Sequence, residues 1–181
     1  MKTIEARIPD VLLLEPRVLQ DERGYFLESW NAREFRKATK SDVQFVQDNH
    51  SRSTRNVLRG LHYQITQPQG KLIRVVSGRI FDVAVDLRKS QPTFGHWVGH
   101  ELSEDDHRQL WIPVGFAHGF LVLSEFADVL YKTTDYYAPE HERCLIWNDP
   151  EIRIDWPLDR EPVLSAKDQL GLSLAQAEVF T

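Results

Sequence analysis

The stretch KLIRVVSGRIFDVAVDL, residues 71–87, decides the fold class of this chain. It holds two strand-like runs, Lys71–Ser77 and Ile80–Leu87, with Gly78 between them. Four apolar side chains recur at every second position of the later run: Phe81, Val83, Val85 and Leu87. A period of two is that of a strand with one buried face, and glycine suits a tight turn. The stretch therefore predicts two antiparallel strands joined as a hairpin at Gly78.

Similar short segments recur along the whole sequence. The other expected strands are Val11–Glu15, Tyr25–Trp30, Phe45–Ser51, Val57–Tyr63, His96–Leu102, Gln109–Ile112, His118–Val122, Asp128–Thr133 and Cys144–Trp147. Short helices are expected at Asn31–Lys37, with Asn31 as N-cap and Glu34 at the third helical position, and at Ser173–Phe180. This pattern predicts a mainly β fold, a sandwich or a barrel with a few short helices. The 181 residues suit one domain, residues 1–181.

Composition excludes several classes of function. A formal net charge of -5 argues against general nucleic-acid binding, since no basic excess is available to neutralise phosphates. Cys144 is the one cysteine, so no intrachain disulfide is possible and a reducing compartment fits. The segment Met1–Asp10 lacks the apolar core of a secretory signal, and no apolar run is long enough to span a bilayer. We therefore expect a cytoplasmic protein without membrane contact.

Five polar residues stand beside apolar strand residues, where solvent exposure is not expected: His62, Lys71, His118, Tyr131 and Asp168. His62 is a candidate general base, because an imidazole titrates near neutral pH. Taken alone, the segment favours the ordinary interpretation, a hydrogen-bonded core histidine. The others also have ordinary interpretations: a strand-end lysine, a turn histidine, a cross-strand aromatic and a cap or loop aspartate.

A metal site is the first alternative for these histidines. His118 lies in PVGFAHGF, residues 113–120, which resembles the second cupin motif, where the histidine is often a metal ligand. The place of the first motif reads His62-Tyr63-Gln64 and lacks the second histidine, while Lys71 follows nearby. Two histidines beside a cation make a poor metal site, which wants three or four ligands. We therefore expect no metal.

Two pairs of residues suggest ligand contacts. Gln47 and Asn49 share one strand face, and paired amides can read a sugar or base edge or simply form a solvated surface. Arg59 and His62 are three apart, so an ideal strand sends them to opposite faces. Gly60 permits a bulge that would change this. The sequence leaves both questions open.

Other chemistries find no support. The chain has no phosphate-binding glycine loop of the P-loop or dinucleotide type and no Gly-x-Ser-x-Gly elbow. Nucleophilic catalysis and hydride transfer are therefore not expected.

Taken in order, a series of segments resembles the dTDP-4-dehydrorhamnose 3,5-epimerase family over nearly the whole chain. They are DERGYF at 21–26, Glu28, QDNHS at 47–51, VLRGLHYQ at 57–64, PQGKL at 68–72, GRIFDVAVDLR at 78–88, PVGFAHGF at 113–120, YKTT at 131–134, Tyr136 and LSAKD at 164–168. The resemblance implies a jelly-roll cupin fold, a homodimer, and a dTDP-4-keto-6-deoxy sugar as substrate, with no cofactor.

The resemblance also implies roles for single residues. His62 would be the base, Asp168 its carboxylate partner and Tyr131 the acid, with Lys71 and His118 facing the keto oxygen. Substrate contacts are implied for Arg23, Glu28, Gln47, Asn49, Arg59, Glu142 and Lys167. On chemical grounds arginines such as Arg23 and Arg59 suit a diphosphate, and an aromatic such as Phe26 or Tyr136 suits the thymine or the sugar.

The ketone of such a substrate acidifies the hydrogens on carbons 3 and 5, so a base and an acid on opposite sides of the ring can invert both centres. Three alternatives remain: a single-carbon epimerase on a related sugar, a metal-dependent cupin enzyme, and a non-catalytic sugar-nucleotide binding module.

Overall fold

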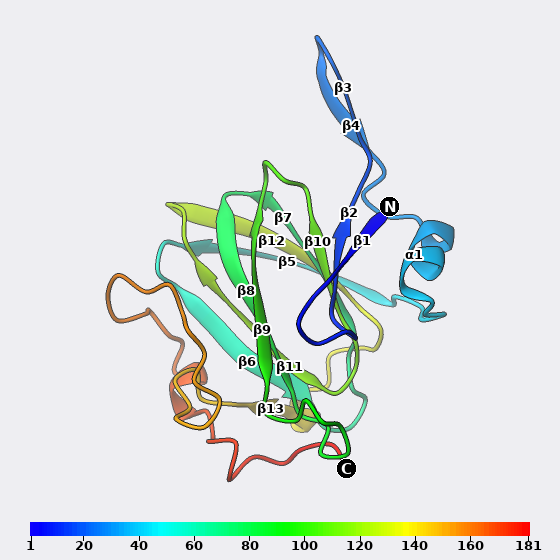
Figure 1. Cartoon of the computed structure of the whole chain (residues 1–181). Coiled ribbons are helices and arrows are strands. Elements are labelled where there is room, and N and C mark those ends of the chain that lie inside the picture. Colours follow the sequence, from blue (N-terminus) through cyan, green and yellow to red (C-terminus); the bar gives the residue numbers. More distant parts are fainter.

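The computed structural model describes residues 1–181 as two antiparallel sheets packed face to face, with a two-stranded hairpin projecting from them (Figure 1). The six-stranded sheet has the order β1 (Lys2–Glu5), β2 (Leu12–Glu15), β10 (Gln109–Ile112), β7 (Lys71–Ser77), β12 (Phe126–Thr133) and β5 (Gln47–Thr54). The five-stranded sheet has the order β13 (Glu142–Cys144), β6 (Leu58–Gln64), β11 (Phe116–Val122), β8 (Arg79–Asp86) and β9 (Trp97–Ser103). The hairpin pairs β3 (Val18–Asp21) with β4 (Gly24–Leu27). The expected jelly-roll cupin fold is confirmed.

Helices are few and short. They are α1 (Ala32–Thr39) and the 3₁₀ turns η1 (Pro139–His141) and η2 (Asp168–Leu170). The predicted cap of α1 is confirmed: Asn31 has an extended backbone, and its Oδ1 accepts from the backbone N–H groups of Arg33 and Glu34 at 3.1 and 3.3 Å. None of these helices has the length and apolar character needed to cross a membrane.

The main core lies between the two sheets, where the inward side chains of both are apolar over most of their area. Its fully buried members include Ile73, Ile80, Ala84, Leu102, Leu110, Ala127 and Val129. A second cluster lies on the outer face of the five-stranded sheet, and the segments after β13 cover it. The interior strands β6, β11 and β8 of that sheet are therefore largely buried on both faces, which fixes their position.

The predicted hairpin at Gly78 is wrong. Strand β7 pairs with β10 and β12, whereas β8 pairs with β11 and β9 in the opposite sheet. Gly78, at φ +78°, lets the chain turn a corner from one sheet to the other, where a side chain would meet the backbone of Phe126. Alternating burial is the same for a hairpin strand and for a strand that changes sheets, so the local pattern does not separate them.

The predicted helix at Ser173–Phe180 is also wrong. This segment is irregular and joins the body through parallel bridges, Leu145↔Leu172 just before it and Arg88↔Phe180 at its end. Its apolar side chains pack on the outer cluster of the five-stranded sheet. Burial against that sheet therefore outweighs the weak local helical tendency. The expected strand Cys144–Trp147 overlaps β13 only at Cys144, because β13 spans Glu142–Cys144, and β1 and β3 were not expected.

Candidate active site

A cleft of about 580 Å³ opens between the inner faces of the two sheets at one end of the body. Ten of the thirteen residues proposed from the sequence line it: Gln47, Asn49, Arg59, His62, Lys71, His118, Tyr131, Glu142, Lys167 and Asp168. They come from both sheets and from the loop before η2. The fold thus brings together polar groups that are more than 100 residues apart in the sequence.

A bulge in β6 allows Arg59 and His62 to face the same cleft. His62 pairs with His118 of β11, and Arg59 pairs with Phe120. The two residues Gly60 and Leu61 of β6 therefore lie opposite one residue of β11, Gly119. Gly60 has φ +111°, and a Cβ there would lie 2.6 Å from the backbone oxygen of His118. The extra residue shifts the alternation by one position, so both side chains reach the cleft. This resolves the question that ideal strand geometry left open.

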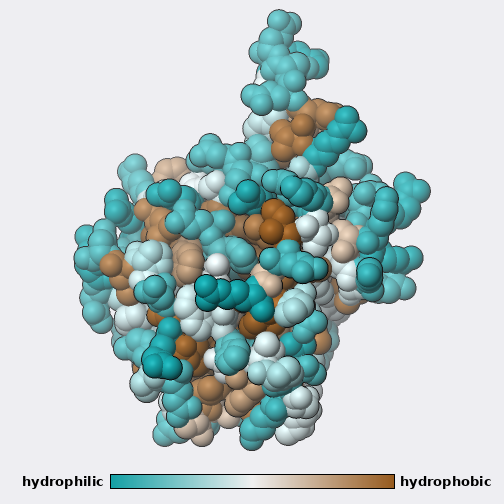
Figure 2. Space-filling view, in the orientation of Figure 1, coloured by the Kyte–Doolittle hydropathy of each residue, from teal (hydrophilic) through white to brown (hydrophobic).

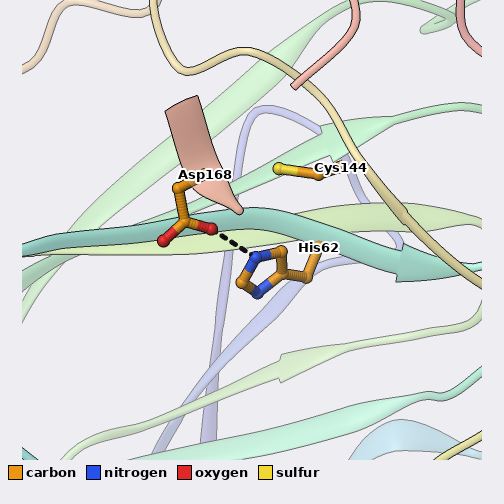
Figure 3. Close-up of side chains that lie close together, drawn as sticks. All are labelled: His62, Cys144 and Asp168. Atoms are coloured by element: carbon orange, nitrogen blue, oxygen red, sulfur yellow. Dashed lines mark hydrogen bonds and ion pairs between the residues drawn. The ribbon is translucent and has the colours of Figure 1, made fainter. Parts of the chain in front are cut away.

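His62 and Asp168 form a hydrogen-bonded pair (Figure 3). His62 Nε2 lies 2.5 Å from Asp168 Oδ1, and Ser165 donates its hydroxyl to Oδ2 of the same carboxylate at 2.7 Å. Burial raises the pKa of Asp168, but the hydrogen bonds from His62 and Ser165 lower it more, so the net pKa is below its ordinary value. An ionised carboxylate only accepts, so Nε2 carries the proton and Nδ1 is left basic. The arrangement suits a general base held in one tautomer.

Tyr131 approaches the cleft from the other sheet. It lies on β12 of the six-stranded sheet, whereas His62 lies on β6 of the five-stranded sheet, and both line the cleft. A base and a phenol therefore stand on opposite walls. Burial raises the pKa of Tyr131, so the phenol stays protonated at neutral pH and is able to donate.

Lys71 is the buried cation of the site. Its Nζ donates to the backbone oxygen of His62 at 3.3 Å, and only 9% of the residue is exposed. Burial lowers its pKa to about 8, against the opposing influence of Asp82 and Glu142. It therefore remains protonated at neutral pH, in a place where a positive charge is little screened by water.

Glu142 links the entrance residues. It forms an ion pair with Lys167, and the Tyr137 hydroxyl donates to its Oε2 at 2.7 Å. Burial raises the pKa of Glu142, but these two partners lower it more, so the carboxylate is ionised. On the facing sheet, Gln47 Nε2 donates to Asn49 Oδ1 at 2.9 Å. The paired amides are therefore oriented toward one cleft rather than toward open solvent.

Sequence matching and the site geometry together decide the family. The chain matches the sequence profile of dTDP-4-dehydrorhamnose 3,5-epimerase over residues 5–176. A relative of that name from Pseudomonas aeruginosa is 63% identical over 180 residues, covering 99% of both chains. The chain belongs to the dTDP-4-dehydrorhamnose 3,5-epimerase family. It is accordingly an isomerase, and the resemblance seen in the sequence is confirmed.

Solved structures of this family agree with the fold. The dTDP-6-deoxy-D-glucose-3,5-epimerase of Legionella pneumophila, in complex with dTDP-4-keto-L-rhamnose, is similar with a TM-score of 0.96 at 50% identity, over 98% of this chain and 94% of that one. A 3'-monoepimerase from Streptomyces bikiniensis, in complex with dTDP-quinovose, is similar with a TM-score of 0.88 at 34% identity, over 97% and 88%. The same fold thus carries double and single epimerases.

Three of the residues proposed from the sequence lie outside the cleft of this family member. Arg23 and Phe26 belong to the projecting β3–β4 hairpin and Glu28 follows it directly (Figure 1). Arg23 pairs with its neighbour Asp21, and Phe26 is 66% exposed. Figure 2 shows hydrophobic side chains on the part of the hairpin nearer the body, beneath a hydrophilic tip. Within one chain these residues have no contact with the cleft.

One cluster has the residue types of a metal site. The ligand atoms of His62, Cys144 and Asp168 lie within 4.8 Å of one another. However, His62 and Asp168 are already bonded to each other, and burial raises the pKa of the Cys144 thiol to about 12. A metal requires the thiolate, which such a thiol supplies poorly. The donor set therefore fits a hydrogen-bonded dyad better than a metal centre.

Sequence reasoning missed three residues of functional interest. Tyr137 and Ser165 line the cleft, and Asp82 supports His118 from behind. Asp82 had no local signal, because it alternates with Phe81 and Val83 and so falls on the strand face that the pattern assigns to solvent, whereas the structure buries it between the sheets. Ser165 had a signal in its spacing, since a serine three residues before an aspartate commonly forms a local turn with it. Tyr137 had no signal that distinguished it from Tyr136.

Proposed function

We propose that this protein inverts carbons 3 and 5 of dTDP-4-dehydro-6-deoxy-D-glucose, giving dTDP-4-dehydro-L-rhamnose in dTDP-L-rhamnose biosynthesis. One observation carries the proposal: the His62–Asp168 base and the Tyr131 phenol face one cleft from opposite sheets. Removing a proton from one face of a sugar ring and returning one to the other face requires this arrangement.

In the first half of each inversion, His62 Nδ1 takes the hydrogen next to the ketone as a proton. The C–H electron pair then forms the enolate double bond, and the carbonyl oxygen becomes negative. Asp168 stabilises the imidazolium through Nε2–H without itself taking a proton. The Lys71 ammonium stabilises the enolate oxygen, in a cleft where burial strengthens that interaction.

In the second half, Tyr131 donates its phenolic proton to the opposite face of the same carbon, and the ketone reforms. The tyrosinate regains a proton, and His62 releases one, by exchange with solvent in the open cleft. No electrons are gained or lost, so the reaction needs no redox cofactor, and Lys71 takes the place that a metal would have at the oxygen. We propose that no cofactor is required.

The remaining polar lining suits the nucleotide and the sugar. Arg59 donates to Ser53 Oγ at 2.8 Å, which holds its guanidinium at the cleft, where it can bind the diphosphate. Gln47, Asn49, Glu142 and Lys167 offer amide, carboxylate and ammonium groups to hydroxyl and base edges. We propose these residues as substrate contacts.

A homodimer would complete the site. Arg23, Phe26 and Glu28 lie on or beside a projecting hairpin whose exposed side chains include Val18, Leu19, Tyr25 and Phe26. An isolated two-stranded hairpin with exposed apolar groups is marginal in water and favours a covering surface. We propose that each hairpin reaches the cleft of a partner subunit, where Arg23 binds phosphate and Phe26 packs on the base or sugar. A cytoplasmic location fits the single cysteine and the nucleotide-sugar substrate.

Incubation with dTDP-4-dehydro-6-deoxy-D-glucose in deuterium oxide tests the proposed reaction. Double epimerisation should place deuterium at carbons 3 and 5, as NMR or mass spectrometry of the product would show. Label at carbon 3 alone would instead make the protein a single epimerase, the alternative that the similarity to the Streptomyces bikiniensis 3'-monoepimerase supports. Absence of label at both carbons would refute the epimerase proposal.

A further inference from the structure

His118 has a carboxylate behind it, as His62 has. Its Nε2 lies 3.0 Å from both Oδ1 and Oδ2 of Asp82, a residue that is 0% exposed. In β11 and β6, His118 and His62 are direct cross-strand neighbours. The cleft therefore holds two adjacent histidine–aspartate pairs, of which only His62–Asp168 has a role in the proposed mechanism.

Asp82 stands at the centre of three groups that can carry positive charge. His100 of β9 lies directly opposite Asp82 in the sheet, and His118 of β11 bonds to it from the other side. Lys71 approaches from the facing sheet, close enough for the Asp82 charge to raise its pKa. His100 Nε2 is buried and has no hydrogen-bond partner. A fully buried carboxylate needs hydrogen-bond donors and nearby positive charge, and here His118 supplies a hydrogen bond while Lys71 is the group that supplies charge.

The direction of the His118–Asp82 hydrogen bond determines whether His118 offers a donor or an acceptor to a ligand in the cleft. An ionised carboxylate accepts only, so Nε2 carries the proton. Burial lowers the pKa of His118, which keeps the ring neutral and leaves Nδ1 without a proton. With Nε2 bonded to Asp82, Nδ1 is the ring nitrogen left for a ligand in the cleft that His118 lines, and in a neutral ring it accepts a hydrogen bond and donates none. It therefore cannot assist Lys71 at the enolate oxygen, in contrast to the role that the family resemblance implied for it.

We propose that Asp82 is a positioning residue for the epimerisation: it holds His118 as a hydrogen-bond acceptor for a sugar hydroxyl, and its negative charge favours the Lys71 ammonium that stabilises the enolate oxygen. The inference rests on the proposed epimerase function. It assigns the stabilisation of the oxygen to Lys71 alone and gives His118 the task of orienting the ring.

The test compares two buried aspartates of one strand. Asp82→Asn keeps the shape and removes the charge beside Lys71. Asp86→Asn is the matched control, because Asp86 is also 0% exposed on β8 but bonds to Arg88 and Thr93, away from the cleft. We expect Asp82→Asn to lower kcat by about 10- to 100-fold with KM changed less than about threefold. This is less than the 10²–10³ that loss of one preorganised donor commonly costs in kcat, because Lys71 itself remains. Asp86→Asn should reduce thermal stability and leave kcat of the folded protein within about twofold, as expected for an effect on folding alone.

A measurement on the unmodified protein keeps the proposal falsifiable if either variant fails to fold. In ¹⁵N-histidine NMR spectra, His118 should show a protonated Nε2 and an unprotonated Nδ1 at neutral pH. A protonated Nδ1, or an unchanged kcat in folded Asp82→Asn, would overturn the proposal, as would an equal loss of kcat in Asp86→Asn. Deuterium incorporation by the wild type is scored separately. A protein with the expected His118 tautomer but no exchange would refute the epimerase function and not the Asp82–His118 pair.

Discussion

The cleft and the β3–β4 hairpin differ in how firmly the fold positions their side chains. The four residues of the proposed chemistry that lie on strands, His62, Lys71, His118 and Tyr131, are on interior strands that pair on both sides, so register and burial determine where each side chain points. The hairpin has two strands of four residues, and the side chains of β3 are exposed throughout. Chemistry that depends on placement within about half an ångström belongs on the rigid part. Binding groups tolerate a less constrained element, which a partner can hold in place.

Removing the base should give the largest effect. We expect His62→Asn to lower kcat by about 10³-fold, because general-base catalysis is commonly worth 10²–10⁴. Binding of dTDP should be unchanged, since the base acts on the sugar ring. Steady-state kinetics and calorimetry would measure the two effects. His96→Asn, at an exposed position directly before β9, is the control and should behave as the wild type. Turnover of His62→Asn near the wild-type rate would rule out His62 as the base.

Removing the charge of Lys71 should give the second largest effect on kcat. We expect Lys71→Met to lower kcat by about 10²-fold, through loss of the charge at the enolate oxygen. Its pKa of about 8 also predicts the alkaline limb of the pH profile, because the ammonium persists below that pH and is lost above it. Burial, with a smaller contribution from Lys167, lowers this pKa, while Asp82 and Glu142 raise it. Wild-type kcat should therefore fall about tenfold per pH unit above 8, whereas Lys71→Met should lack that limb. A wild-type profile that stays flat to pH 9.5 would contradict the assignment.

The hairpin should affect binding more than chemistry. We expect Arg23→Ala to raise KM about tenfold with little change in kcat, since one charge-assisted contact is worth roughly 1.5–3 kcal/mol. Co-expression of the Arg23→Ala chain with a His62→Asn chain tests the proposed dimer. In a mixed dimer, the cleft of the Arg23→Ala chain keeps its His62 and receives the intact hairpin of the His62→Asn chain. Activity with a low KM should therefore reappear. If mixing restores nothing, the hairpin does not serve a partner's cleft.

Removing the N-cap of α1 should lower the stability of the protein without changing its activity. Asn31→Ala removes the side-chain acceptor for two backbone N–H groups, so the free energy of unfolding should fall by about 1 kcal/mol. Helix α1 packs on the outer face of the six-stranded sheet through Phe35, away from the cleft. Denaturant unfolding and kinetics on the same samples would separate the two effects. A fall in kcat at temperatures where the variant is fully folded would show that the helix influences the cleft.

Sequence patterns predicted the positions of strands and helix caps better than they predicted which strands pair with each other. The strand at residues 71–77 and the cap at Asn31 were predicted because both depend on neighbouring residues alone. The hairpin at Gly78 was wrong because pairing depends on strands far away in the chain. The same limit hid Asp82, whose meaning depends on His118, 36 residues later.

The sequence by itself determined the family, the β-rich class and the identity of His62, Lys71, Tyr131 and Asp168 as the residues to consider, because ordered motifs and the period of two are local properties. Only the tertiary structure decided that His62 and Tyr131 line one cleft from different sheets, that the bulge at Gly60 turns Arg59 into the cleft, and that the Nε2 of each cleft histidine meets a buried carboxylate. Those relations arise from packing between distant segments, where burial and electrostatics are set by the whole fold.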